Sequence, residues 1–423
     1  MTSKESIALA SRRTTIKKTI LFLHSSDDLY GADQVLLQVA TEMLDSPFRP
    51  LVVLPDDMAH VGLLSAELRR RGVDFMHAPI AIIRRRYFRP SGFVPLLSRA
   101  VRGSWMLRRI VREQNVILIY GFTFAVLAAP LAAIASRRPL VMHAHEILVG
   151  PSFVRRAMHK LFVGPAAAVA CISNAVRRHI LADEPGAAQK LCLVHNGLAP
   201  FEKRITKLAA RMELGVHDGL PLIGMVGRVS AWKGQGVLLE AAAILRDRGY
   251  RFHCMAIGGV FDGDERNRKA LLAQREQLGL KHEFSLVDFR PDVRALYSAF
   301  DIFVLPSIEP EPFGMVILEA MQTSLPVVAS RHGGPLEIVI DGDTGLLFEP
   351  KNPSALADCL AQLLDDPLTA ERMGQAGAKR WEEEFTFRRQ ASRLLEIFES
   401  VLANRSLPCE GDAAQSPTKR QAD

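Results

Sequence analysis

Short apolar runs alternate with longer amphipathic segments through the first half of the chain. The runs are rich in Val, Ile and Leu and carry few polar positions, which is typical of strands buried on both faces of a sheet. We expect strands at 19–24, 50–54, 74–78, 116–120, 140–143, 167–171 and 190–194, and helices at 32–44, 63–71, 94–113, 125–136, 154–162 and 174–181. This alternation predicts a parallel sheet with helices on both faces.

The same alternation restarts after Asn196 and Gly197. We expect strands at 222–227, 252–257, 282–287, 302–306, 326–329 and 344–348, and helices at 235–248, 313–321, 353–364, 368–385 and 387–402. The two series predict an α/β fold of two doubly wound, Rossmann-like domains, each with a parallel sheet, that face each other across a cleft.

The length of 423 residues also favours two domains, because a single hydrophobic core rarely grows that large. We place an N-terminal domain at 17–198 and a C-terminal domain at 199–385. A last helix at 386–404 is expected to pack back toward the N-terminal domain. The polar tails at 1–16 and 405–423 are expected to be disordered.

One uncharged stretch, 116–136, is long enough to cross a bilayer. Its β-branched start, Gly121 and Pro130 instead favour a strand, a turn and a helix. The apolar run at 19–23 is too short for a signal-peptide core. Five scattered cysteines without Cys-x-x-Cys spacing favour reduced thiols. We therefore expect a cytoplasmic protein.

Positive charge is concentrated in the first half of the chain. Residues 1–200 hold 26 Lys and Arg against 14 Asp and Glu, a balance of +12, and residues 201–423 hold 27 against 32, a balance of −5. The basic half interleaves its arginines with apolar side chains: Arg84, Arg85, Arg86, Phe88, Arg89, Phe93, Leu96, Leu97, Arg99, Arg102, Trp105, Arg108, Arg109 and Arg112. These are either solvated helix faces or a helix lying on an anionic membrane surface, and we favour peripheral membrane contact.

Two acids stand eight positions apart in the second half, Glu311 and Glu319, directly after the apolar run at 302–306. Phe313 and Gly314 lie between them, at the expected start of a helix at the carboxyl end of a buried strand. Ligands of open α/β sheets bind at that edge, and the first amides of such a helix attract phosphate. The pattern indicates a nucleotide-linked ligand.

A second strand-to-helix turn carries two cations. Gly227 and Arg228 follow the strand at 222–227, and Lys233 comes five positions after the arginine. Arg228 can grip a diphosphate through its planar guanidinium, and Lys233 can supply a point charge. Together they could neutralise a leaving diphosphate.

In the other half of the chain, His143 ends the strand at 140–143, and His145 and Glu146 follow directly after it. No third ligand stands at the usual spacing for zinc, so we expect no metal here. We assign His145 to substrate positioning and His143 to the structure. The acids at 262–264 and 341–343 fit glycine turns better than a metal site. The Gly-x-Gly-x-x-Gly fingerprint is absent, so a nicotinamide cofactor has no support.

These features together resemble the family 4 glycosyltransferases, retaining enzymes of the GT-B fold, over roughly residues 18–403. The ordered matches are Tyr30-Gly31-Ala32-Asp33, His145, Ile172-Ser173-Asn174, His195-Asn196-Gly197, Gly227-Arg228, Lys233, Gly258-Gly259, Pro306-Ser307, 311–319, Gly333-Gly334-Pro335-Leu336-Glu337 and 341–345. Many family members carry a glycine pair in the first loop, where this chain has Tyr30-Gly31. That difference narrows the conformational freedom of the loop at Tyr30 and keeps Gly31 available for close approach to the donor.

The resemblance implies a role for each of these residues. Gly227, Arg228 and Lys233 would hold the donor diphosphate, and the amides near Met315 and Val316, after Phe313 and Gly314, would hold its phosphate. Glu319 would bind the ribose and Glu311 the transferred sugar. Gly31 would let the first loop approach the donor, and His145 would sit beside the sugar near the acceptor.

The implied reaction moves a sugar from a nucleotide-diphosphate sugar with its anomeric configuration kept, with no cofactor and no bound metal. A basic, aromatic-rich acceptor half favours a glycan or lipid-linked acceptor in bacterial surface polysaccharide or lipopolysaccharide synthesis. A nucleotide-sugar epimerase on the same fold is the enzyme alternative. A glycosidase would have no use for the phosphate-binding groups, and no recognised motif supports a nucleic acid partner.

Overall fold

The computed structural model describes residues 17–408 except 30, 58–61, 85–86, 88–89, 202–204, 218, 261–264 and 291, and leaves out the side chains of 90 and 91. The tail at 1–16, most of the tail at 405–423, Tyr30, Arg85, Arg86, Phe88, Arg89 and the acids at 262–264 therefore lie outside the described residues. The predictions made for them stay predictions.

The N-terminal domain is built on a parallel sheet with, in the described residues, the strand order β3-β2-β1-β4-β5-β6-β7. The strands are β1 (Lys18–Leu23), β2 (Phe48–Pro55), β3 (Asp74–Ala78), β4 (Val116–Phe122), β5 (Leu140–Ala144), β6 (Ala168–Cys171) and β7 (Leu191–Leu193). The helices are α1 (Gly31–Glu42), α2 (Leu63–Arg70), α3 (Pro90–Glu113), α4 (Ala128–Ser136), α5 (Ser152–Val163) and α6 (Asn174–Asp183). The strand order reverses between β1 and β4, which places the topological switch point there.

The C-terminal domain repeats this architecture with the described strand order β10-β9-β8-β11-β12-β13, again parallel. The strands are β8 (Leu222–Val226), β9 (His253–Ile257), β10 (Phe284–Val287), β11 (Ile302–Leu305), β12 (Val327–Ser330) and β13 (Gly345–Phe348). Its helices are α7 (Lys207–Glu213), α8 (Gln235–Asp247), α9 (Glu265–Gln277), α10 (Val293–Leu296), α11 (Met315–Gln322), α12 (Pro335–Ile338), α13 (Pro353–Asp365) and α14 (Pro367–Glu384), and the chain then continues into α15 (Phe387–Leu402). The switch point lies between β8 and β11.

The predicted α/β class with two parallel sheets is confirmed. The uncharged stretch at 116–136 is strand β4, a turn and helix α4, as predicted. Within the part of the chain that the structure describes, no helix has both the length and the apolar character needed to cross a membrane. Helices α7, α9, α10 and α12 were not predicted. The longest of them, α9, is polar along most of its length and buries Leu271, so it has no apolar stripe to detect.

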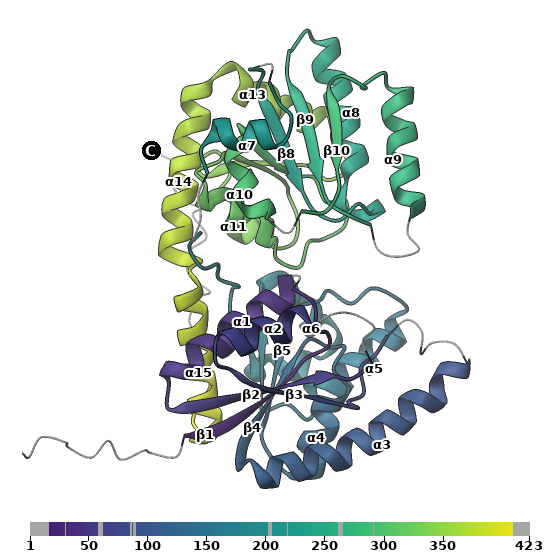
Figure 1. The fold of residues 1–423 in the computed structure, drawn as a ribbon, viewed down its shortest axis with the longest axis vertical. Coiled ribbons are helices and arrows are strands. Elements are labelled where there is room, and N and C mark those ends of the chain that lie inside the picture. The colour runs from purple at the N-terminus through teal and green to yellow at the C-terminus, as the bar shows by residue number, and fades with distance from the viewer. Residues whose placement is uncertain are drawn as a thin grey trace, which may run out of the picture.

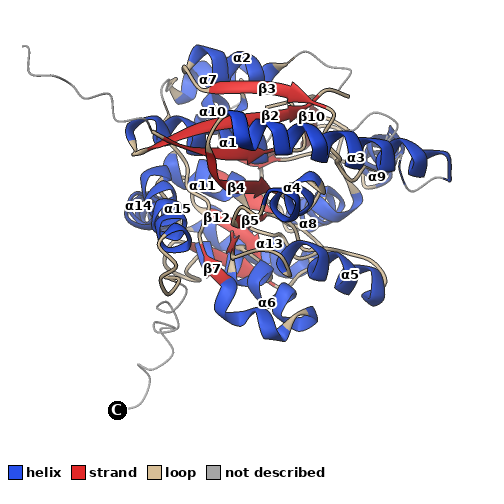
Figure 2. Ribbon diagram, turned by 90° about the horizontal axis from the view of Figure 1, so that it is seen from below, coloured by secondary structure: helices blue, strands red, loops and turns tan. Residues whose placement is uncertain are grey.

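Helices cover both faces of the N-terminal sheet. Residues of α3, α4, α5 and α6 pack on one face in one apolar cluster, and residues of α1, α2 and α15 pack on the other. Figure 2 shows α15 and α3 on opposite sides of the strands. Leu394, Ile397 and Phe398 of α15 are buried, and the ring of Phe398 lies 5.1 Å from that of Tyr120 on β4. Helix α15, which follows the C-terminal domain in the sequence, is therefore part of the N-terminal core (Figure 1).

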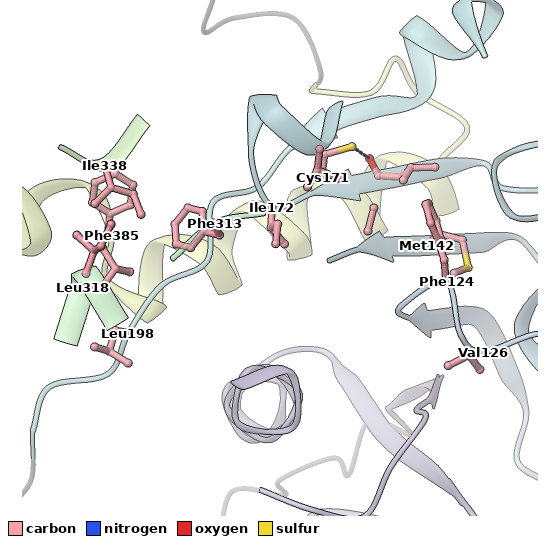
Figure 3. Packing of buried hydrophobic residues seen from close by; sticks show 14 of the residues in the cluster. Phe124, Val126, Met142, Cys171, Ile172, Leu198, Phe313, Leu318, Ile338 and Phe385 are labelled. Carbon is pink, nitrogen blue, oxygen red and sulfur yellow. Dashed lines mark hydrogen bonds between the residues drawn. The ribbon is translucent and has the colours of Figure 1, made fainter. Parts of the chain in front are cut away.

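The two domains share apolar packing. A single cluster contains Ile172, which follows β6, together with Phe313 and Phe385 of the C-terminal half. Figure 3 shows Phe313 between Ile172 on one side and Ile338 and Phe385 on the other. This contact lies directly beside the segment predicted to bind the donor.

The cysteines of the described residues are largely buried. Cys171, Cys254 and Cys359 are free thiols, and burial raises the pKa of Cys171 to about 12. The prediction of reduced thiols is confirmed for these three cysteines.

Candidate functional site

The carboxyl ends of the two sheets meet at the domain interface. The Ser173 hydroxyl, after β6, donates a hydrogen bond to the Pro312 carbonyl, after β11, at 2.6 Å. The Nε2 of His195, after β7, lies 2.9 Å from the Glu337 carboxylate, which follows β12. Because ligands of parallel sheets bind at this edge, the interface is the expected place for a shared site.

The turn after β8 is fixed by its backbone. Gln235 Nε2 donates to the Arg228 carbonyl at 2.9 Å, while the Arg228 side chain is exposed. Gly234 has a φ of +81°, and a Cβ on it would lie 1.8 Å from the Pro306 carbonyl oxygen. A glycine is therefore required at 234, because it lets the turn touch the end of β11. Gly227, at the end of β8, has a φ of +157°.

The structure brings Lys233 and Glu311 together. The Lys233 Nζ lies 2.7 Å from Glu311 Oε2, and the Ser307 hydroxyl donates to the same oxygen at 3.0 Å. The two charged side chains are only 15% and 9% exposed, so water screens the pair weakly. The ammonium also lies 4.2 Å from the ring centre of Trp232. A cation and an acid predicted from two separate motifs thus form one polar centre.

Helix α11 begins at Met315, two residues later than predicted. Gly314 takes a left-handed conformation with a φ of +107°, so the helix cannot include it. The Ile317 amide makes a helical hydrogen bond to the Gly314 carbonyl at 2.9 Å. The amides of Met315 and Val316 come before it and point out of the first turn, where an anion could accept from them. Phe313 is buried and anchors this turn.

Glu319 lies one turn inside α11 and is partly buried. Tyr297 donates its hydroxyl to Glu319 Oε2 at 2.7 Å. Burial raises the pKa of Glu319, and the hydrogen bond from Tyr297 and the charge of Arg294 partly offset this rise. Tyr297 was not predicted as a site residue, because no pattern in the sequence around it indicates a contact with an acid 22 positions away.

On the N-terminal side, His145 follows β5 and packs against two neighbouring rings at tilted angles. Its ring centre lies 4.1 Å from that of His143 and 4.5 Å from that of Phe122. Burial and the nearby His143 and His24 hold the pKa of His145 well below its usual value, so the ring is neutral at pH 7. Its Nε2 is buried and has no hydrogen-bond partner among the described residues. His143 is fully buried, and its Nδ1 lies 2.5 Å from the Tyr120 hydroxyl.

Glu146 is a further ionisable group of this loop. Its carboxylate accepts from the Phe124 amide at 3.3 Å and from the His145 amide at 3.2 Å. Burial raises the pKa of Glu146 to about 7, and these hydrogen bonds limit the rise. The acid therefore holds the loop that presents His145.

Gly31 is the first residue of α1 and is exposed. A Cβ on Gly31 would meet no atom within 4 Å, so the space beside it is open. The turn before it is held by Asp33, whose Oδ1 lies 2.7 Å from His24 Nε2 and accepts from the Ser26 hydroxyl. Both Gly31 and His145 lie at carboxyl ends of strands of the N-terminal sheet.

Asp341, one of the acids assigned to glycine turns, has partners in its own domain. Asp341 accepts from the Leu347 amide at 2.8 Å and pairs with Arg331. Among the described residues, one group has the spacing of a metal site: His159, His179 and Asp183, whose ligand atoms lie within 4.8 Å of one another. It sits on α5 and α6, and Asp183 there is already bound by Arg155 at 2.6 Å.

Comparison with known proteins agrees with this geometry. Residues 29–200 match the family model described as Glycosyltransferase Family 4, and residues 207–380 match Glycosyl transferases group 1. The alpha-maltose-1-phosphate synthase of Mycobacterium tuberculosis is 32% identical over 305 residues, covering 66% of this chain and 78% of that protein. The D-inositol 3-phosphate glycosyltransferase of Corynebacterium glutamicum is 34% identical over 216 residues, covering 50% of this chain and 51% of that protein. The chain spans about half the length of the inositol-phosphate enzymes that it matches.

Among solved structures, the Anabaena protein HepE in complex with UDP and glucose is similar at a TM-score of 0.77 and 26% identity. The match covers 90% of this chain and 99% of HepE. The two family models thus match both halves of the chain, and the HepE structure matches the arrangement of both domains. The chain belongs to the family 4 glycosyltransferases and has the GT-B fold.

Proposed function

We propose that this protein transfers a sugar from a nucleotide-diphosphate sugar to an acceptor, with retention of the anomeric configuration and without a metal or other cofactor. The observation that carries the proposal is the meeting of Lys233, Glu311 and the first turn of α11 at the carboxyl ends of the adjacent strands β8 and β11. HepE, with the same fold, binds UDP and glucose, which supports a nucleotide-sugar donor.

In this proposal the C-terminal domain holds the donor. Arg228 and Lys233 bind the diphosphate, and the amides of Met315 and Val316 bind the phosphate next to the sugar. When the bond between the anomeric carbon and the phosphate oxygen breaks, negative charge grows on that oxygen, and these groups stabilise it. Glu319 binds the ribose hydroxyls, and Glu311 binds hydroxyls of the sugar.

The acceptor is bound by the N-terminal domain. Its hydroxyl oxygen forms the new bond to the anomeric carbon on the face that the phosphate leaves, and its proton passes to the leaving phosphate. His145 is neutral at pH 7, so it can position a sugar hydroxyl by a hydrogen bond without a net charge. Gly31 leaves room for the donor at the end of β1.

We further propose that the acceptor is a membrane-linked glycan of bacterial surface polysaccharide or lipopolysaccharide synthesis. Helix α3 supports this proposal, because it exposes a stripe of apolar residues at a spacing of three or four: Val94 (71% exposed), Leu97 (55%), Val101 (64%) and Trp105 (70%). Exposed arginines flank and continue the stripe at 102, 108, 109 and 112. An apolar stripe bordered by cations is suited to an anionic lipid interface.

A second exposed apolar pair lies on the same side of the N-terminal domain. Val149 is 95% exposed and Phe153 is 71% exposed, in the loop that follows His145 and at the start of α5. Figures 1 and 2 both place α5 and α3 on this side of the molecule. A membrane contact there would bring the loop of His145 near the lipid surface that carries the acceptor.

Two experiments test the proposal. Thermal shift with a panel of UDP-, GDP- and ADP-sugars should identify a stabilising donor, with UDP-glucose the first choice because HepE binds it. Stabilisation by no nucleotide sugar would contradict the transferase proposal, and consumption of donor without any acceptor would indicate an epimerase. Flotation with liposomes tests the proposed membrane association separately. Equal binding to anionic and neutral liposomes would contradict the membrane association and leave the proposed transferase activity unaffected.

A further inference from the structure

Glu337 belongs to the C-terminal domain, but its side chain binds the N-terminal domain. The carboxylate accepts from the backbone amides of Asn174 and Ala175 at 2.8 and 3.0 Å, and from the Asn174 side chain at 3.1 Å. It also lies 2.9 Å from Nε2 of His195. All of these groups lie at the carboxyl ends of β6 and β7.

The contact has the form of a helix cap supplied by another domain. The first amides of α6 lack partners within the helix and carry a partial positive charge, which favours an anion. Ser173 satisfies the Val176 amide at 3.0 Å, and Glu337 satisfies the two amides before it. Burial acts to raise the pKa of Glu337, but the hydrogen bonds from His195, Asn174 and Ala175 outweigh it and lower the pKa. The carboxylate is therefore charged at neutral pH.

The segment that carries Glu337 is packed against the predicted sugar-binding acid. The Gly334 amide donates to the Glu311 carbonyl at 2.8 Å. A Cβ on Gly333 would lie 2.3 Å from the same oxygen, and a Cβ on Gly334 would lie 2.2 Å from the Phe313 carbonyl oxygen. The glycine pair therefore packs directly against the backbone of 311–313 as one unit, with no side chain between them.

The N-terminal domain contacts this unit from the other side. The Ser173 hydroxyl donates to the Pro312 carbonyl at 2.6 Å, and Ile172 and Phe313 share an apolar cluster. The loop from Glu311 to Phe313 thus lies between the glycine pair of its own domain and the residues that precede α6. Glu337 joins the two sides through partly buried hydrogen bonds of its carboxylate.

We propose that Glu337 is a positioning residue that fixes the register of the two domains, so that the acceptor side and the donor side of the interface stay aligned during transfer. This inference rests on the proposed function for its effect on turnover. The alignment itself rests on the contacts alone. Misplacement of reacting groups by about 1 Å can cost on the order of a hundredfold in rate.

The test compares Glu337→Ala and Glu337→Gln with Glu349→Ala as a control, since Glu349 is 68% exposed and lies 3.5 Å from Arg331. Glu337→Ala should let the two domains adopt a wider range of relative positions. Small-angle X-ray scattering should detect this as a larger radius of gyration. Turnover should fall by about 10- to 100-fold, because alignment is lost. Affinity for UDP should change less than about threefold, because the proposed diphosphate ligands all lie in the C-terminal domain. Glu337→Gln keeps one acceptor oxygen and should recover part of the turnover.

Circular dichroism checks that each variant folds, and Glu337→Gln carries the test if the alanine variant does not. An unchanged radius of gyration in both variants would overturn the inference. So would a loss of UDP affinity as large as the loss of turnover, since that would place Glu337 in the donor site. If the wild-type protein binds no nucleotide at all, the proposed function fails, and the scattering comparison still decides whether Glu337 aligns the domains.

Discussion

The Nζ of Lys233 lies 2.7 Å from Oε2 of Glu311, so the cation proposed to hold the donor diphosphate is paired with the acid proposed to contact the sugar. The two residues are 78 positions apart and belong to the turns after neighbouring strands. A donor that enters between them would share the lysine with Glu311, and the diphosphate and the sugar would be fixed together. This pairing makes the position of Lys233 dependent on an intact β11 turn.

Removal of the cation should therefore damage donor binding and chemistry together. We expect Lys233→Ala to abolish measurable turnover and to weaken donor affinity by about 10- to 100-fold, since a charge-assisted hydrogen bond contributes about 1.5–3 kcal/mol. Isothermal titration with the donor and a transfer assay provide the two measurements. Lys351→Ala is the control, because Lys351 is 59% exposed and pairs with Glu309 at the surface. Near-normal kinetics in Lys233→Ala would count heavily against the proposed site.

Close contact between two turns should make Gly234 intolerant of any side chain. Both Gly234→Ala and Gly249→Ala place alanine at a positive φ, +81° and +90°, which costs about 1 kcal/mol. A Cβ at 249 meets no atom within 4 Å, whereas a Cβ at 234 would lie 1.8 Å from the Pro306 carbonyl oxygen. We expect Gly234→Ala to lower the free energy of unfolding by at least about 2 kcal/mol more than Gly249→Ala, because the β11 turn must shift.

Chemical denaturation measures this difference. Donor affinity should fall in Gly234→Ala and stay unchanged in Gly249→Ala. Equal stability losses in the two variants would show that the contact with Pro306 does not constrain the site.

The α3 stripe should govern association with lipid. Trp105→Asp replaces an apolar side chain that is 70% exposed with an anion beside Arg102 and Arg109. We expect at least about a fivefold loss of binding to anionic liposomes, because both apolar burial and charge attraction weaken. Added salt should weaken wild-type binding as well, since it screens the arginines.

A matched control is Leu368→Asp, at a residue 79% exposed on α14 of the C-terminal domain. Liposome binding by this variant should equal that of the wild type. A loss of the same size in both variants would mean that charge balance, rather than the α3 stripe, decides the association.

The raised pKa of Glu146 predicts a pH-dependent stability. Its pKa rises from the ordinary 4.5 to about 7 in the folded protein, so the folded state holds the proton more tightly than the unfolded state. The contribution of protonated Glu146 is complete below pH 4.5 and is lost as pH rises through about 7, by about 3 kcal/mol. Glu146→Gln mimics the neutral form and cannot ionise.

The stability of Glu146→Gln relative to the wild type should therefore improve between pH 5 and pH 8. Parallel thermal melts across this range provide the measurement, and the wild type serves as its own reference at pH 5. A constant difference between the two proteins across the range would show that Glu146 titrates at its ordinary pKa.

Local sequence determined most of the secondary structure of this protein. Apolar runs such as the one that forms β4 specify buried strands by themselves, because a strand buried on both faces needs apolar side chains at nearly every position. Glycine turns after β8 and β11, with Arg228, Lys233, Glu311 and Glu319, marked the candidate site, because the carboxyl ends of parallel strands share an edge. The polar α9 escaped prediction because a mostly exposed helix has no apolar period.

Tertiary structure decided what those residues touch. The start of α11 at Met315 depends on the left-handed Gly314, and the hydroxyl bound to Glu319 comes from Tyr297. The cap that Glu337 places on α6 joins residues 163 positions apart. Hydrogen bonds and ion pairs act over about 3 Å, and only the packing of two domains brings groups so distant in the chain within that range.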